Sequence, residues 1–211
     1  MFRLFRELQR GEFFVVFGDC AQGGIDKNFV VFMSKTRLDI PLVLSMNGVA
    51  AEMTPHLHQA LNWVHQKTGI KPIVALERNN GGSSAMHDLM TSNAAGNYSL
   101  YYMRNMMTGE QTDKLGWDTT GGARDTEGTR PKMLGEWLAV YNSKMIGIYD
   151  KEIQEQHQTF IISKSGKPQA APNTHDDAVM ACAGAYQLYQ TENPPMIRKE
   201  RPRPQRARFH V

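Results

Sequence analysis

The sequence predicts an α/β protein in which a mixed β-sheet is covered by helices on both faces. Its 211 residues, 41% of them hydrophobic and 21% charged, suffice for one ordinary globular core. Three apolar runs without helical periodicity come first, followed by an amphipathic helix, another apolar run and a second helix. A β-β-β-α-β-α order of this kind, continued by one more strand and further helices, is typical of a mixed sheet between helical layers.

The segment Phe13 to Asp19, FFVVFGD, is the strand around which the prediction is built. An unbroken apolar run indicates a strand buried on both faces of a sheet. Its final residue is a carboxylate, which must be paired or bound to a cation if it lies inside the protein. The rigid end of a buried strand is therefore a suitable position for a metal ligand.

Strands and helices alternate through the rest of the first half. The strands at 29–33 and 41–46 follow at short intervals, so we expect an antiparallel meander of the first three strands. Apolar residues at helical spacing predict a helix over 51–68, which Gly69 ends. A strand over 72–77, a short helix over 84–91 and a strand over 99–103 complete this half.

The second half opens with a polar, glycine-rich segment at 105–131, for which we expect a long functional loop. The predicted elements after it are a helix from 132 to 141, a strand over 146–149, a helix over 151–159, a hairpin over 160–171 and a helix from 174 to about 189. The last helix carries alanines and Cys182 along one face, which suits close packing on a sheet.

We expect three regions: a lead-in at 1–12, a domain at 13–190 and a basic tail at 191–211. The lead-in is either the end of a linker or an N-terminal helix. The tail segment 198–208 holds six basic residues against one acidic residue, while the remainder carries a net charge of −2 out of the total of +3. It is either a disordered terminus or a contact for phosphates.

No apolar stretch approaches the length of a membrane helix, and the N-terminus is too charged for a signal peptide. Two cysteines, Cys20 and Cys182, are too few for a disulfide framework and are expected to be buried thiols. These features predict an intracellular protein without a membrane partner.

Acidic residues stand at the ends of three predicted elements. Asp19 ends the first strand, Glu77 ends the strand over 72–77, and Asp176 and Asp177 begin the last helix. Two hard divalent ions that hold both oxygens of a phosphodiester displacement require several carboxylates at one point. We therefore predict that these acids converge on two metal ions, with Asp177 as the main ligand of its pair.

Taken singly, every one of these acids except Asp19 has a simpler explanation. Asp176 and Asp177 suit a helix N-terminus through capping and the helix dipole alone. Glu77 is equally compatible with a surface position. Only the conjunction of the sites favours metal binding.

Four short motifs follow one another along the chain: DCAQGG after the first strand, LERNNGG, KLGWDTT at 114–120, and HDDAVMA at the start of the last helix. In the order of these motifs the sequence resembles the C-terminal nuclease domain of the large terminase subunit of tailed bacteriophages. The resemblance covers about 13–189. It implies an RNase H-like fold, shared with RuvC-type resolvases and retroviral integrases.

The resemblance also implies an activity: that of a Mg²⁺- or Mn²⁺-dependent endonuclease that cuts concatemeric viral DNA during genome packaging in the host cytoplasm. Matched by motif, the metal-binding and catalytic residues are Asp19, Glu77 and Asp177 or Asp176, with His175 orienting a ligand or a water. The implied partners are double-stranded DNA, the small terminase subunit, the portal protein and an N-terminal ATPase motor domain. This sequence contains no GxxxxGK[ST] motif for such a motor.

Basic residues cluster around the glycine-rich segment and are candidate contacts for DNA phosphates: Arg104, Lys114, Arg124, Arg130 and Lys132. A solvated loop whose charges balance nearby acids explains them equally well. Two alternatives to the terminase activity also stay open. One is a nuclease resembling Holliday-junction resolvases, and the other is a non-catalytic RNase H-like module that binds DNA or a portal protein.

Overall fold

The computed structural model of the chain describes residues 1–24, 26–105, 108–119, 129–164, 166 and 168–194. The strands are β1 (Phe2–Leu4), β2 (Phe14–Asp19), β3 (Asn28–Ser34), β4 (Asp39–Met46), β5 (Ile73–Leu76), β6 (Ser99–Leu100), β7 (Tyr102–Arg104), β8 (Gln111–Leu115), β9 (Gly147–Ile148), β10 (Phe160–Ile162) and β11 (Pro168–Ala170). The helices are α1 (Ala50–Thr68), α2 (Gly82–Ser92), α3 (Thr129–Asn142), α4 (Lys151–Gln158) and α5 (Asp177–Thr191). In this part of the chain no helix has the length and apolar character of a membrane span.

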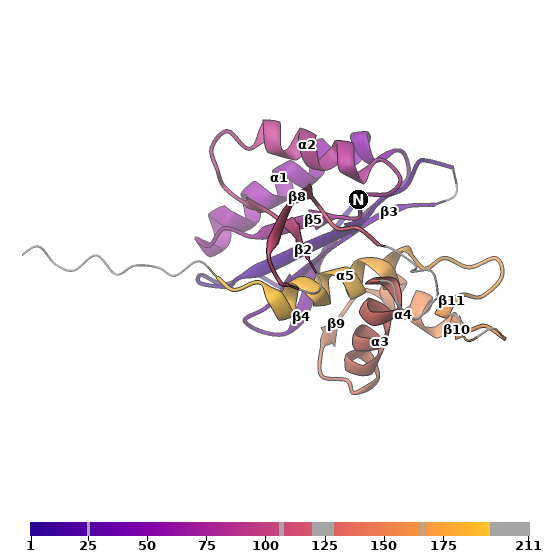
Figure 1. Cartoon of the computed structure of the whole chain (residues 1–211). Coiled ribbons are helices and arrows are strands. Elements are labelled where there is room, and N and C mark those ends of the chain that lie inside the picture. The colour runs from indigo at the N-terminus through magenta and orange to yellow at the C-terminus, as the bar shows by residue number, and fades with distance from the viewer. Residues whose placement is uncertain (25, 106–107, 120–128, 165, 167, 195–211) are drawn as a thin grey trace, which may run out of the picture.

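A mixed sheet in the order β1-β4-β3-β2-β5-β6 forms the centre of the molecule, and β9 pairs with β4. β2, β3 and β4 are antiparallel neighbours, whereas β5 runs parallel to β2. Helices α1 and α2 cover one face, and α3, α4 and α5 cover the other (Figure 1). The predicted mixed sheet between two helical layers, with an antiparallel start, is therefore confirmed.

The alternation of side chains along β2 divides the core into two halves. Val15 and Phe17 pack with residues of α3, α4 and α5, while Phe14 and Val16 pack with residues of α1 and α2. All four are 0–1% exposed. A strand buried on both faces needs apolar residues at every position, which explains the unbroken run in its sequence.

Helix α5 packs very closely on β2, because the helix face that contacts the strand consists of small residues. A Cβ atom added to Gly184 would stand 2.3 Å from the ring of Phe17. The helix face beside it consists of small residues, among them Ala181 and Cys182, which are fully buried. The predicted small-residue face of the last helix is thus the surface that rests on the sheet, and both cysteines are buried free thiols as expected.

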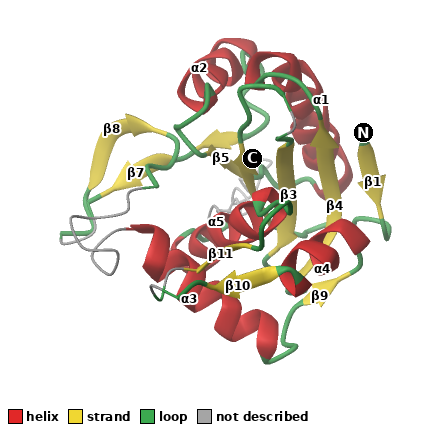
Figure 2. Ribbon diagram, turned by 90° about the vertical axis from the view of Figure 1, so that its right-hand side faces the viewer, coloured by secondary structure: helices red, strands yellow, loops and turns green. Residues whose placement is uncertain are grey.

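Two segments differ from the expectation. The lead-in contains β1, which pairs antiparallel with β4 instead of forming a helix. The glycine-rich segment contains β8, which pairs with β7 in a hairpin (Figure 2). β8 lacks the apolar alternation by which a strand is recognised, and β1 alternates over only three residues, too few to distinguish a strand from an amphipathic helix. Residues 120–128 of the expected loop lie outside the described part of the structure, as do residues 195–211 of the tail.

A buried histidine joins α3 to α4. The indole N–H of Trp137 donates to Nε2 of His157 at 2.7 Å, and Nδ1–H of His157 donates to the carbonyl of Ile153 at 2.6 Å. Both ring nitrogens are therefore engaged in a way that only the neutral imidazole allows. Burial lowers the pKa of His157 to about 4, and the hydrogen bond to Ile153 opposes this shift only in part.

Gly184→Ala is expected to destabilise the protein by about 1–3 kcal/mol, because the added methyl group meets the Phe17 ring and α5 must move away from the sheet. Gly135→Ala in α3 is the matched control. A Cβ there meets no atom within 4 Å, so this variant should be neutral or gain up to about 1 kcal/mol from helix propensity. Urea denaturation of both variants measures the difference, and equal effects would contradict the packing argument.

Protonation of His157 should destabilise the fold in acid. Its pKa is lower in the folded than in the unfolded chain, so the unfolded chain binds the additional proton and stability falls as the pH drops from about 6.5 to 4. The loss should reach on the order of 3 kcal/mol relative to His157→Gln. Free energies of unfolding measured against pH test this, and parallel curves for the two proteins would disprove it.

Candidate active site

Asp19 and Glu77 come together because β2 and β5 are parallel and in register. Gly18 pairs with Leu76, and the N–H of Glu77 donates to the carbonyl of Gly18 at 2.9 Å. Asp19 ends β2 and Glu77 directly follows β5. Side chains two positions apart on a strand point to the same face. Phe17 and Ala75 point toward α5, so Asp19 and Glu77, each two residues further along, point to that face as well.

Asp177, the first residue of α5, is brought to the same edge of the sheet by the packing of the helix. It lies about two helical turns, or ~10 Å, before Gly184, which rests on Phe17. Asp19 lies about 7 Å beyond Phe17 along the strand. The helix start and the strand end therefore meet at one place.

The carboxylate of Asp19 responds strongly to this environment. Asp19 is half-buried at the end of β2. Burial raises the pKa of Asp19 well above its usual range, and a hydrogen bond with Glu77 and the charges of Glu77, Asp177 and Asp176 raise it further. These interactions place Glu77, Asp177 and Asp176 within electrostatic reach of Asp19.

The two acids of the helix start have different partners. Asp177 accepts a long hydrogen bond of 3.4 Å from the backbone N–H of Lys27, and burial raises its pKa to about 6. Asp176 forms an ion pair of 2.9 Å with Arg130 of α3. Among the described residues, Asp177 is thus the member of the pair that has no ion-pair partner.

Further polar groups surround these acids, and sequence reasoning gave none of them a role. The side-chain amide of Asn79 donates to Oε1 of Glu77 at 3.0 Å. Asp26, in the turn between β2 and β3, adds negative charge beside Asp177 and lies 3.7 Å from Nδ1 of His175. The only sign of Asp26 in the sequence is that it is an acidic residue in the turn after the strand that ends with Asp19.

The LERNNGG and KLGWDTT motifs pack against each other at this edge of the sheet. Trp117 forms a parallel bridge with Glu77, and the N–H of Arg78 donates to the carbonyl of Trp117 at 2.8 Å. Gly82 begins α2 so close to the strand end that an added Cβ would stand 1.8 Å from the carbonyl oxygen of Glu77. Glycine is thus required at this position for the Glu77 backbone to keep its place.

The predicted DNA-contact residues lie at different distances from the acids. Arg130 is the one that touches the acidic cluster, whereas Lys114 pairs with Asp118 and Lys132 lies 4.0 Å from Glu136 on α3. Arg104 pairs with Glu192 just after the C-terminal end of α5, about 22 Å along the helix from Asp177. Arg124 lies outside the described residues.

The acids do not form a finished ligand set. Among the described residues, no group of three histidine, cysteine or acidic side chains is arranged closely enough to hold a metal ion. Carboxylates without a cation between them repel one another, and Arg130 holds Asp176 aside. What the geometry offers is a set of oxygen donors from two rigid strand ends and one helix start.

Asp19→Asn should stabilise the metal-free protein by about 1–3 kcal/mol at pH 7. Because the pKa of Asp19 is raised in the folded state, the parent loses stability as the pH rises above 3.8, and the neutral amide avoids this loss. Asp88→Asn, on the exposed face of α2, is the control and should change stability by less than ~0.5 kcal/mol. Thermal unfolding with a chelator present measures both, and an Asp19→Asn variant no more stable than the parent would contradict the electrostatic argument.

Comparison with known proteins finds similarity in structure alone. No protein-family model matches the sequence, and no curated protein matches it. The large terminase nuclease from thermophilic phage G20c, solved with bound magnesium, matches with a TM-score of 0.65 and 14% identity over 88% of this chain and 86% of that chain. The large terminase nuclease domain of Thermus phage P74-26 matches with a TM-score of 0.59 and 15% identity over 90% and 86%. The large terminase nuclease domain of P22 matches with a TM-score of 0.55 and 14% identity over 93% of this chain and 90% of that chain. The chain therefore has the RNase H-like fold of the nuclease domain of phage large terminases.

Proposed function

We propose that this protein is a metal-dependent DNA endonuclease that cuts concatemeric viral DNA during genome packaging. The observation that carries the proposal is the meeting of Asp19, Glu77 and Asp177 at one edge of the sheet, each without an ion-pair partner among the described residues. The fold of phage terminase nucleases supports the same conclusion.

Buried acids elsewhere in the described chain form ion pairs with arginines, which makes the lack of such a partner at Asp19, Glu77 and Asp177 informative. Arg6 pairs with Glu12 and Asp39, and Arg3 pairs with Asp150. These three acids are 1–5% exposed, and each is paired with a guanidinium, Glu12 and Asp39 sharing that of Arg6. Glu77 is 7% exposed, and within the described part of the chain its carboxylate has hydrogen bonds with the neutral amide of Asn79 and with Asp19 but no ion pair with a basic residue. A buried acid that is left without a cation by the protein is suited to receive one from solution.

The donor set fits magnesium or manganese. All of its members are carboxylates, and hard divalent ions prefer oxygen ligands. Two such ions bound by Asp19, Glu77 and Asp177 would neutralise charge that develops on a phosphodiester and lower the pKa of water near them. Asp176 is the further candidate ligand, if a bound ion replaces Arg130 as its partner.

The protein's own residues have distinct tasks in this proposal. The paired strand ends fix the backbones of Asp19 and Glu77, while Asn79 and the N–H of Lys27 orient the carboxylates of Glu77 and Asp177. Arg130, at 2.9 Å from Asp176, lies where it can contact a DNA phosphate beside the acids. His175 remains a candidate for orienting a ligand or a water.

We extend the proposal to the partners of packaging: double-stranded DNA, an ATPase motor domain, the small terminase subunit and the portal protein. Arg104, Lys114, Arg124 and Lys132 stay predicted DNA contacts. Of these, Lys114 lies nearest in sequence to Trp117, which bridges to Glu77, so we rank it above Arg104.

Asp19→Asn and Glu77→Gln should each lower Mn²⁺-dependent nicking of supercoiled plasmid by about 100-fold or more, since each removes a charged ligand. Asp177→Asn should lower it more than Asp176→Asn, because Arg130 already neutralises Asp176. Nicking rates over a Mg²⁺ and Mn²⁺ titration measure the losses.

Asp88→Asn serves as the matched control and should nick at the parental rate. Binding of the same DNA by each variant is measured in parallel in the presence of a chelator. A parent that binds DNA but never nicks would identify a non-catalytic module, and preferential cutting of four-way junctions over linear duplex would favour a resolvase. Unchanged nicking in Asp19→Asn would remove the assignment of the site.

A further inference from the structure

The outermost strand of the sheet, β1, lies far in the sheet order from the acidic site. β1 pairs with β4 through the partners Phe2–Leu44, Arg3–Val43 and Leu4–Leu42, and it ends the strand order. Figure 2 shows β1 at the border of the molecule, with β4 on its inner side. Its outer side is therefore an open sheet edge within the described structure.

The backbone of β1 offers free hydrogen-bonding groups along this edge. The N–H of Phe5 donates to the carbonyl of Pro41, and the N–H of Ser45 donates to the carbonyl of Met1. In an antiparallel pair the bonded residues alternate, so Met1, Arg3 and Phe5 face β4. The N–H and C=O groups of Phe2 and Leu4 consequently point outward.

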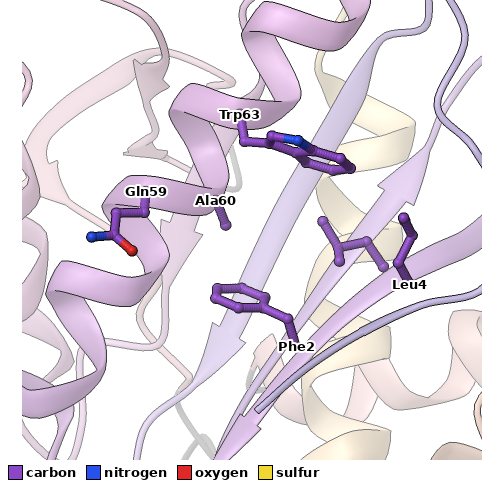
Figure 3. A pocket seen from close by; sticks show the side chains of 6 residues that line it. Phe2, Leu4, Gln59, Ala60 and Trp63 are labelled. Atoms are coloured by element: carbon purple, nitrogen blue, oxygen red, sulfur yellow. The ribbon is translucent and has the colours of Figure 1, made fainter.

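An apolar groove adjoins these outward groups. It has a volume of about 260 Å³ and is lined by Phe2, Leu4, Leu42, Gln59, Ala60 and Trp63. Figure 3 shows the side chains of Phe2 and Leu4 on the strand facing Trp63 and Ala60 on α1. Phe2 is 39% exposed and Leu4 49%, so the protein leaves apolar surface uncovered beside an unpaired edge.

The opposite face of the same strand has a second, polar cavity. Arg3 points to this side, where it pairs with Asp150 at 2.6 Å and Glu152 at 2.9 Å. The cavity has a volume of about 560 Å³, and Tyr149, Lys151 and Glu155 also line it. An edge with an apolar groove on one face and a polar cavity on the other matches the alternation of side chains in an extended chain.

We propose that the open edge of β1 binds an extended segment of a partner protein, which adds a strand to the sheet. The partner's backbone would pair with the outward N–H and C=O groups of Phe2 and Leu4. Two of its side chains at alternate positions, aliphatic or aromatic, fill the groove beneath Trp63, and the polar side chain between them enters the cavity beside Arg3. Main-chain pairing supplies the affinity and the two cavities supply the selectivity.

A second copy of the chain is a poorer occupant. Antiparallel pairing of β1 with another β1 about Arg3 sets two arginines directly opposite each other, and the two guanidinium groups could not both approach without disturbing the ion pairs that each forms with Asp150 and Glu152 of its own chain. A segment with a neutral or acidic residue at that position has no such penalty. The sequence of β1 therefore favours a different chain as partner.

The test selects linear peptides from a displayed random library on the purified chain and measures their binding by fluorescence anisotropy. Selected peptides should carry apolar residues at alternate positions and should slow amide exchange at Phe2 and Leu4. Leu4→Pro removes one outward N–H without removing a bond to β4, and proline is tolerated on such an edge. It should weaken binding about tenfold.

Phe2→Asp tests the groove independently of backbone geometry and should weaken binding to a similar extent. Ile162→Asp is the matched control at another exposed apolar residue, 72% exposed on β10, and should leave binding unchanged. Thermal unfolding confirms that each variant is folded, and Phe2→Asp decides the question if Leu4→Pro is not. Recovery of no binding peptide, peptides that bind Phe2→Asp as well as the parent, or self-association of the chain that Leu4→Pro abolishes would each overturn the proposal.

Discussion

The parallel pairing of β2 with β5 is the interaction on which the rest of the structure depends. It brings the ends of two strands that are far apart in the sequence to one edge of the sheet, and the hydrogen bond from Glu77 to Gly18 fixes their relative height. With the register set, side-chain alternation directs both carboxylates to the face covered by α5. A slip of one residue would turn one acid toward α1 and separate the pair.

Much of this arrangement could be predicted from local sequence. The apolar runs of β2, β3 and β4, the periodicity of α1 and the small-residue face of α5 each reflect burial that the element requires on its own. The positions of the acids at element ends were equally visible. That the side chains of Asp19 and Glu77 point to the same face of the sheet follows from the apolar runs that precede them, once the pairing of β2 with β5 is known.

The rest could not be predicted, because it depends on contacts between distant segments. β1 and β8 become strands through pairing with neighbours, because the alternation of β1 covers only three residues and the polar sequence of β8 has none. The ion pair of Arg130 with Asp176 and the position of Arg104 beyond the far end of α5 depend on how α3 and the β7–β8 hairpin dock. Basic residues that are close in sequence thus lie in separate parts of the molecule.

The place of α5 late in the chain has a consequence for biosynthesis. This helix supplies much of one core half and also carries Asp177, so a nascent chain still lacking it exposes the underside of the sheet and has an incomplete set of acids. The full set of carboxylates, including Asp177, can assemble only after α5 has left the ribosome. Completion of the fold and completion of the acidic cluster are therefore one event, and truncated translation products would lack both.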